Sequence, residues 1–266
     1  MAYFKNKVVW ITGASSGIGE ALAIALSGAG ALVILSSRRF DELERVRKAC
    51  TNKGNVKIVT LDLLDTASLA AKTAEAIAAF GHIDVMVHNG GISQRSLVAD
   101  TGMQVQRKVM EIDYFSYVEL TNHILPHFIQ RGSGCFVVMS SVMGKIGTPM
   151  RGAYAAAKHA LHGFFDCLRA EVFDKGIQVT VLTPGYIRTN VTMNAVTGDG
   201  TPLNKVGENI GNGLPAEKAA QQIMKAVENG KFEAYIGKPG NEKLALIVNR
   251  FMPNLLHKMV RKQLPK

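Results

Sequence analysis

Seven short apolar runs recur along the chain, and longer segments with helical spacing separate them. The runs are rich in β-branched residues and lack a clean alternation of apolar and polar positions, as expected of strands buried on both faces of a parallel sheet. One intervening segment, 66–80, has helical spacing and meets Gly81, a common helix stop. The seven predicted strands lie at 7–12, 31–36, 56–61, 83–88, 135–140, 177–183 and 232–237.

The alternation of strand and helix predicts an α/β fold. We expect one domain over residues 1–266, a Rossmann-type doubly wound parallel sheet of about seven strands with helices on both faces. The chain shows no internal repeat or low-complexity linker. A polar, glycine-rich stretch at 194–213 is the one long irregular segment, and we predict that residues 186–213 form a loop over a substrate.

Composition indicates an ordinary soluble globular protein, since 47% of the 266 residues are hydrophobic and 20% are charged. The most apolar stretch, 21–35, has Ser27, Gly28 and Gly30 in its middle, so a helix followed by a strand explains it better than a membrane span. The first strand begins at residue 7, which leaves no room for a signal peptide, and we expect a cytoplasmic protein.

The three cysteines are an odd number and are far apart in the sequence. Cys50, Cys135 and Cys167 each have apolar neighbours. This pattern predicts buried thiols in a reducing compartment rather than a disulfide framework.

The net charge of +10 is concentrated at the C-terminus, where residues 238–266 carry seven Lys or Arg and one Glu. No nucleic-acid motif or aromatic platform accompanies the charge, so we expect no nucleic-acid partner. Apolar positions recur there at three- and four-residue steps, which predicts a basic amphipathic extension interrupted by Pro253. Such a segment can lie on an anionic membrane, but we favour packing on the body or on a neighbouring subunit because proline spoils a long surface helix. The apolar positions are Leu244, Val248, Phe251, Leu255 and Met259.

The first predicted strand runs into TGASSGIG at 12–19, which opens a helix. Gly13 permits a tight turn, and Gly17 and Gly19 let the backbone and the helix approach a pyrophosphate. The N-terminus of the helix adds free amide groups and a positive dipole. This arrangement predicts a dinucleotide site.

The second predicted strand ends in two serines followed by Arg38 and Arg39, with no acid between the strand and the arginines. An acid near this point would bind the adenosine ribose 2′-hydroxyl, whereas an arginine accommodates a 2′-phosphate. Arg38, with Arg39 and Ser37 as further candidates, therefore predicts NADP(H). Asp62, after the third strand, is a candidate acceptor for the adenine amino group or a cap for the next helix.

Tyr154 and Lys158 are four residues apart in a helical segment, so both side chains lie on one face. A free tyrosine has a pKa near 10, and a neighbouring ammonium favours the phenolate. Ser141 lies at the carboxyl end of the fifth predicted strand, where ligands bind in such sheets.

With these features together, the sequence resembles the short-chain dehydrogenase/reductase family. Two further stretches, NVTMNAVTGDG at 190–200 and RFMP at 250–253, resemble the member-seven branch of that family. The family motifs, in the family's order, are TGASSGIG at 12–19, LDL at 61–63, HNGG at 88–91, Ser141, Tyr154-AAA-Lys158 and TPGYIRT at 183–189.

The resemblance implies a role for each motif residue. Tyr154 would exchange a proton with the carbonyl or alcohol oxygen, Lys158 would support it and bind the nicotinamide ribose, and Ser141 would hydrogen-bond the carbonyl. The cofactor would supply the hydride. The expected cofactor contacts are Gly13, Ser15, Ser16, Gly17, Ile18, Gly19, Ser37, Arg38, Asp62, Leu63, Asn89, Gly91, Tyr154, Lys158, Pro184, Gly185, Ile187 and Thr189.

Two positions depart from the family pattern. His88 stands where the family has the first of two asparagines, and we expect it to alter only local packing. Asp113 stands where the family has the asparagine of its proton relay, so we include it among the catalytic residues. Because Asp113 adds a possible negative charge beside Lys158, we expect an active enzyme with an altered pH dependence.

The prediction is an NADP(H)-dependent oxidoreductase that interconverts a small apolar ketone or aldehyde and an alcohol. The alternatives are a 3-oxoacyl thioester reductase and a dinucleotide-binding regulatory protein with weak catalysis. No metal is expected, because His123 and His127 have Pro126 between them and no third ligand is evident. The resemblance suggests a homodimer or homotetramer.

Overall fold

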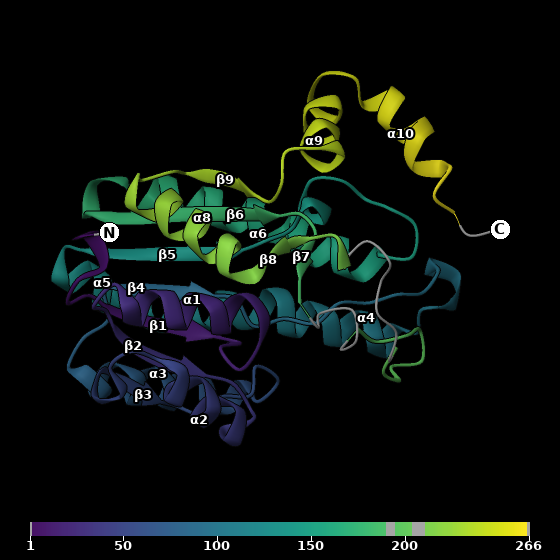
Figure 1. The fold of residues 1–266 in the computed structure, drawn as a ribbon. Helices are drawn as coiled ribbons and strands as arrows, with labels where there is room; N and C mark the ends of the chain where they lie inside the picture. The colour runs from purple at the N-terminus through teal and green to yellow at the C-terminus, as the bar shows by residue number, and fades with distance from the viewer. Residues whose placement is uncertain (1, 190–194, 204–210, 265–266) are drawn as a thin grey trace.

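The computed structural model describes residues 2–189, 195–203 and 211–264, and their core is a parallel sheet between two layers of helices (Figure 1). The sheet has seven strands in the order β3-β2-β1-β4-β5-β6-β9, which confirms the doubly wound fold. A separate pair joins β7 (Ile187–Arg188) to β8 (Leu214–Pro215). The strands of the main sheet are β1 (Val8–Thr12), β2 (Leu32–Ser36), β3 (Val56–Ile58), β4 (Val85–His88), β5 (Gly134–Met139), β6 (Ile177–Pro184) and β9 (Glu233–Ile236).

Both faces of the sheet are buried, which explains the continuous apolar runs in the sequence. Along β1, Val9 and Ile11 join one apolar cluster, whereas Val8 and Trp10 join another on the opposite face. The Trp10 indole N–H donates to Ser36 Oγ at 2.8 Å, so its polar atom is satisfied inside the core.

Helices α1, α2 and α8 contribute to the first cluster, and α3, α5 and α6 contribute to the second. The predicted helix at 66–80 is confirmed as α3, and it ends at Gly81 in a left-handed conformation with φ 81°. The helices are α1 (Gly17–Gly28), α2 (Phe40–Ala49), α3 (Thr66–Phe80), α4 (Met103–Met110), α5 (Ser116–Arg131), α6 (Gly152–Glu171), α8 (Ala216–Glu228), α9 (Asn241–Phe251) and α10 (Pro253–Arg261).

Two details of the sequence prediction were wrong. The strand predicted at 56–61 ends at Ile58, although the Val59 and Leu61 amides still donate to carbonyls of the β2 segment at 3.1 and 3.0 Å. Cys167 is exposed, because it lies on the outward face of α6, whereas Cys50 and Cys135 are buried as expected.

The strand order changes direction between β1 and β4. From β1 the chain builds outward to β2 and β3, and it then returns to place β4 on the other side of β1. Loops at the carboxyl ends of these two strands therefore diverge and leave a crevice, which is where open α/β sheets bind ligands.

A π-helical stretch, Glu111–Phe115, joins α4 directly to α5. The wider turn interrupts the regular α-helical spacing, and such insertions are frequent at functional sites. Asp113 lies in the middle of this stretch and is completely buried.

The basic C-terminal extension consists of α9 and α10, which stand out from the body of the molecule (Figure 1). Met252 separates the two helices and Pro253 begins α10, so the pattern is interrupted at Pro253 as predicted. One side packs on the body, where Leu256 is buried against Val142 and Ile146 and Asn249 Nδ2 donates to Lys145 O at 2.9 Å. Leu244, Phe251, Leu255 and Met259 are exposed.

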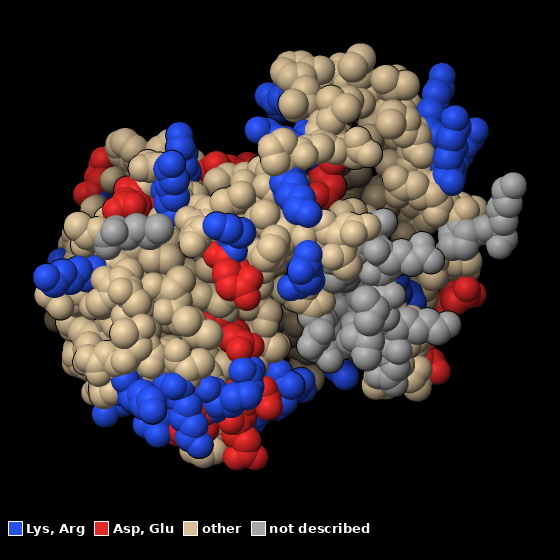
Figure 2. Space-filling view, viewed as in Figure 1, with Lys and Arg blue, Asp and Glu red and all other residues tan. Residues whose placement is uncertain are grey.

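Lys and Arg side chains gather along this extension and over the end of the molecule where α2 lies (Figure 2). Among the described residues, no helix is long and apolar enough to span a bilayer. Of the loop predicted at 186–213, residues 190–194 and 204–210 lie outside the described residues. The described part pairs with the segment after β4 through a bridge between Gln94 and Val196.

Candidate active site

A cavity of about 620 Å³ opens at the carboxyl ends of β1, β2, β4 and β5. Its walls include every site residue predicted from the sequence except Gly19. The glycine turn and the end of β2 form one side, and Ser141, Tyr154 and Lys158 contribute to the wall that also includes Asp113. Residues more than a hundred positions apart in the sequence thus surround one space, as the strand order requires.

The glycine turn needs glycine for two physical reasons. Gly13 has φ 66°, and a Cβ there would lie 2.6 Å from the Cα of Gly90. Asn89 fixes the turn to β4, because its side-chain amide donates to Thr12 O at 3.0 Å and to Gly13 O at 3.2 Å. The result is a tightly fitted backbone cradle at the N-terminus of α1, suited to a pyrophosphate.

Gly19 lies behind this cradle and does not line the cavity. A Cβ at Gly19 would lie 2.4 Å from Gly13 O and 2.6 Å from Asn89 Nδ2. Its absence allows α1 to pack closely on the turn, so Gly19 shapes the site by packing.

Arg38 and Arg39 both line the cavity beside the end of β2. Arg39 reaches the glycine turn, where its Nη2 lies 3.0 Å from Ser15 Oγ and 3.4 Å from Ser16 Oγ. The sequence analysis named Arg38 as the first candidate for the 2′-phosphate. In the structure it is Arg39 whose side chain extends across the glycine turn. Neither guanidinium is ion-paired with a carboxylate within the described residues.

Ser141 lies two residues after the end of β5. It caps a short 3₁₀ helix, Val142–Gly144, where its Oγ accepts from Met143 N at 3.1 Å. Tyr154 and Lys158 lie on the first two turns of α6, with the Lys158 ammonium 5.7 Å from the centre of the Tyr154 ring. All three side chains face the cavity. Their positions bring together a hydroxyl donor, a phenol and a cation, the groups required for proton exchange with a carbonyl oxygen.

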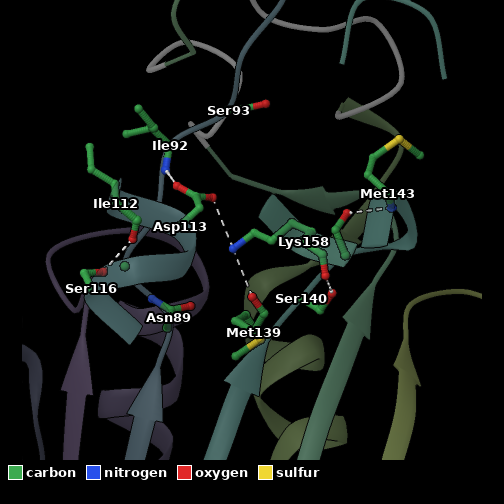
Figure 3. A network of polar contacts seen from close by, with 12 residues as sticks. Asn89, Ile92, Ser93, Ile112, Asp113, Ser116, Met139, Ser140, Met143 and Lys158 are labelled. Carbon is green, nitrogen blue, oxygen red and sulfur yellow. Dashed lines mark hydrogen bonds and ion pairs between the residues drawn. The ribbon is translucent and has the colours of Figure 1, made fainter. Parts of the chain in front are cut away.

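Lys158 lies between two acceptors in the interior (Figure 3). Its Nζ donates to Met139 O at 3.1 Å and forms an ion pair with Asp113 Oδ2 at 3.2 Å. The other carboxylate oxygen of Asp113 accepts from Ile92 N at 2.8 Å. The Asp113 side chain itself is therefore placed beside Lys158, between the loop after β4 and α6.

Burial and charge pairing oppose each other in this pair. Burial alone would lower the pKa of Lys158, but the Asp113 carboxylate, with Tyr117 and Tyr154, outweighs burial and raises that pKa. Burial raises the pKa of Asp113, against the opposing effects of the Lys158 ammonium and the Ile92 amide. Lys158 therefore holds its proton firmly, and part of its positive field is cancelled by the carboxylate beside it.

His88 is fully buried and serves packing, as expected. Its ring stacks on Tyr117 with centroids 4.9 Å apart, and its Nε2 lies 2.9 Å from Thr121 Oγ1. Burial lowers the pKa of His88 to about 3, so the imidazole is neutral in the folded protein.

This burial predicts a loss of stability in acid. As the pH falls below the ordinary histidine pKa of about 6.5, this histidine becomes protonated in the unfolded chain, whereas His88 in the folded protein stays neutral. The free energy of unfolding therefore falls by about 1.4 kcal/mol for each unit by which the pH is lowered. This loss continues as the pH is lowered, until it reaches the pKa of about 3 that His88 has in the folded protein. In His88→Asn we expect the slope of unfolding free energy between pH 6 and 4, measured with urea, to flatten by about this amount. His257→Asn, at an exposed histidine of α10, is the matched control, and equal slopes in both variants would contradict the prediction.

Three features of the site were missed by the sequence prediction. The Met139 carbonyl and the Ile92 amide act through the backbone, which any residue supplies. Ser140 lines the cavity, and its Oγ donates to Lys158 O at 3.1 Å and lies 2.9 Å from His162 Nε2. Its position next to Ser141 was the only clue to it.

The two histidines considered as metal ligands have other contacts. His127 Nε2 accepts from Ile83 N at 3.3 Å, and His123 Nε2 lies 3.7 Å from Glu119 Oε1. The described residues contain no group of three or more side chains that could hold a metal ion.

Comparison with known proteins identifies the family of this chain. The family model for short chain dehydrogenases matches residues 7–200. Rat dehydrogenase/reductase SDR family member 7B is 41% identical over 261 residues, which covers 96% of this chain and 77% of the relative. Human member 7 is 40% identical over 239 residues, covering 88% of this chain and 70% of the relative.

Solved structures show the same fold. A short-chain dehydrogenase from Streptomyces avermitilis has a TM-score of 0.82 and 29% identity, with 96% of each chain covered. An enzyme from Burkholderia phymatum in complex with NAD has a TM-score of 0.83 and 19% identity, covering 100% of this chain and 99% of the other. One from Burkholderia cenocepacia in complex with NADP has a TM-score of 0.78 and 21% identity, covering 97% and 98%. Together with the motifs and the matched family model, these likenesses show that the chain belongs to the short-chain dehydrogenase/reductase family of oxidoreductases, in the branch of members 7 and 7B.

Proposed function

We propose that this protein is an NADP(H)-dependent oxidoreductase that reduces a small ketone or aldehyde to an alcohol, with Tyr154 as the proton donor. The observation that carries the proposal is the shared cavity, in which the glycine cradle and two arginines lie at one side and Ser141, Tyr154 and Lys158 at another. Apolar side chains near the catalytic group, including Ile92, Met139 and Val196, suit the body of an organic carbonyl compound.

The cavity fits a dinucleotide in shape and chemistry. The Gly13 turn leaves no room for a side chain, and the α1 N-terminus beyond it offers amide groups to a pyrophosphate. Asp62, Leu63, Asn89, Pro184 and Ile187 also line the cavity. When bound, the cofactor supplies the hydride.

The chain's own residues handle the proton and the developing charge. Ser141 Oγ and the Tyr154 hydroxyl donate hydrogen bonds to the carbonyl oxygen, and the phenol gives up its proton as negative charge develops there. Lys158, held between Met139 O and Asp113, supports the phenolate that remains. Alcohol oxidation uses the same groups in reverse.

The preference for NADP(H) rests on the end of β2, where Arg38 and Arg39 line the cavity. A guanidinium binds a phosphate through two parallel hydrogen bonds, and hydrogen bonds to charged groups correspond to roughly 10- to 100-fold in affinity. We expect the wild-type protein to bind NADPH at least about 10-fold more tightly than NADH. Arg38→Ala and Arg39→Ala should each weaken NADPH binding by about that factor and leave NADH binding nearly unchanged, as measured by fluorescence titration.

Arg107→Ala is the matched control, since Arg107 is exposed on α4 and does not line the cavity. Equal affinity of the wild-type protein for the two cofactors would contradict the assignment to NADP(H). A larger effect in Arg39→Ala than in Arg38→Ala would agree with the contact of Arg39 with Ser15.

A 3-oxoacyl thioester reductase is the alternative within the family, and turnover of acetoacetyl thioesters tests it. The cytoplasmic location and the homo-oligomeric state expected from the sequence remain proposals. For the C-terminal extension, the contacts of Leu256 and Asn249 with the body support packing over membrane contact.

A further inference from the structure

Arg151 lies beside the catalytic tyrosine without an acidic partner. It precedes α6 by one residue and Tyr154 by three, and its guanidinium carbon is 5.9 Å from the centre of the Tyr154 ring. Its Nη1 donates to Ser93 Oγ and to Gln94 O. No carboxylate of the described residues forms an ion pair with it, and its Nε and Nη2 have no hydrogen-bond partner there.

A second arginine increases the positive charge at this place. Arg95 follows Gln94 on the same segment, and its Nε is buried without a hydrogen-bond partner among the described residues. Burial and the charge of Arg95 lower the pKa of Arg151 to about 10. Burial and the neighbouring Arg95 charge both make the protonated form of Arg151 less stable in the protein without ligand. A bound anion would offset both effects. Both arginines are half-buried, and a pair of neighbouring cations without a counterion favours the binding of an anion.

The position of these arginines connects them to the substrate side of the cavity. Ser93 accepts a hydrogen bond from Arg151 and follows Ile92 in the chain. Ile92 lines the cavity, and its amide donates to Asp113. In Figure 3, Ser93 lies above Ile92 and Asp113. Val196, another wall residue, pairs with the same segment through its bridge to Gln94. Arg151 does not itself line the cavity, but its contact with Ser93 and its place beside the Tyr154 ring put its guanidinium next to the catalytic end of the cavity.

We propose, on the basis of the proposed function, that the carbonyl substrate carries an anionic group, a carboxylate or a phosphate, a few bonds from the reacting carbon, and that Arg151 binds this group with Arg95 behind it. The apolar walls then hold the body of the substrate. The bidentate fork of arginine fits either anion, so the two sources share one recognition chemistry.

The test compares three probes of the same carbon skeleton: a 4-oxo acid, its uncharged methyl ester, and the phosphate monoester of the corresponding keto alcohol. Two quantities are measured for each, kcat/KM with NADPH and the equilibrium affinity with NADP⁺ present, where no turnover occurs. For the wild-type protein we expect one or both charged probes to exceed the ester about 10- to 100-fold in each quantity. The probe with the higher affinity distinguishes carboxylate from phosphate.

Arg151→Gln should reduce this charged-to-neutral ratio at least about 10-fold, and Arg151→Lys should restore part of it. Arg107→Gln, which removes the same charge from an exposed position on α4, should leave the ratio as in the wild type. The ratio is internal to each variant, so a general loss of folded protein does not change it.

Equal affinity of the charged and uncharged probes for the wild-type protein would overturn the inference, whether or not turnover is seen. An unchanged ratio in Arg151→Gln would also overturn it, as would binding of inorganic phosphate alone as tightly as the charged probes. If the charged probes bind selectively but none is reduced, the anion site stands and the proposed reductase function fails.

Discussion

Tyr154→Phe is expected to lower NADPH-dependent carbonyl reduction about 1000-fold and to leave NADPH affinity within about threefold. In the proposed mechanism the phenol, which lines the cavity, is the proton donor, and general acid catalysis contributes about 10²- to 10⁴-fold. Removing one hydroxyl does not touch the glycine cradle or the arginines at the end of β2. Loss of NADPH absorbance measures turnover, and fluorescence titration measures binding.

Tyr114→Phe provides the matched control. Tyr114 packs in the same apolar cluster as Tyr154 but does not line the cavity, so turnover should stay within about twofold of the wild type. Retained turnover in Tyr154→Phe would exclude the tyrosine as the proton donor. A wild-type protein that binds NADPH but reduces no carbonyl compound would favour the rival function, a dinucleotide-binding regulatory protein.

The sequence predicted the parts of the molecule that depend on local pattern. Strands buried on both faces leave continuous apolar runs, and the glycines at 13 and 17 have positive φ in the structure. Tyr154 and Lys158 share a helix face because of their spacing, so their common orientation followed once the helix was assigned. Each of these features is determined by a short stretch of neighbouring residues.

The remaining parts depend on contacts that no local pattern contains. The π-helical stretch that places Asp113 beside Lys158 adds a residue to one turn, which hydrophobic spacing does not indicate. Adjacent Arg38 and Arg39 look equivalent in the sequence, and only the backbone at the end of β2 directs Arg39 to Ser15. The contact between Arg151 and Ser93 joins two segments that meet only in the folded chain.

Lys158→Met is expected to destabilise the folded protein by about 3–5 kcal/mol at neutral pH. The substitution leaves the Asp113 carboxylate, which is fully buried, without the ammonium that lies 3.2 Å from it. Breaking a buried ion pair by removing one partner has costs of this size because the other charge stays in the interior. Urea unfolding at pH 7 measures the change.

The double variant Lys158→Met with Asp113→Asn separates charge from packing. Asparagine keeps the size of the side chain and removes the buried charge, so we expect the double variant to regain most of the lost stability. If it stays as unstable as Lys158→Met, the loss comes from packing of the lysine stem and the ion pair contributes little.

The single variant Asp113→Asn then shows what the carboxylate does to the chemistry. Removing a negative charge beside Lys158 leaves the positive field of the ammonium uncancelled, and this favours the phenolate needed for alcohol oxidation. The rising limb of the pH profile for oxidation should therefore move to lower pH, by about one unit. An unchanged profile would mean that the charge of Asp113 does not tune the proton transfer. Asparagine keeps an oxygen that can accept from Ile92 N, but its amide nitrogen then replaces Oδ2 beside Lys158, so the variant removes both the charge and that contact.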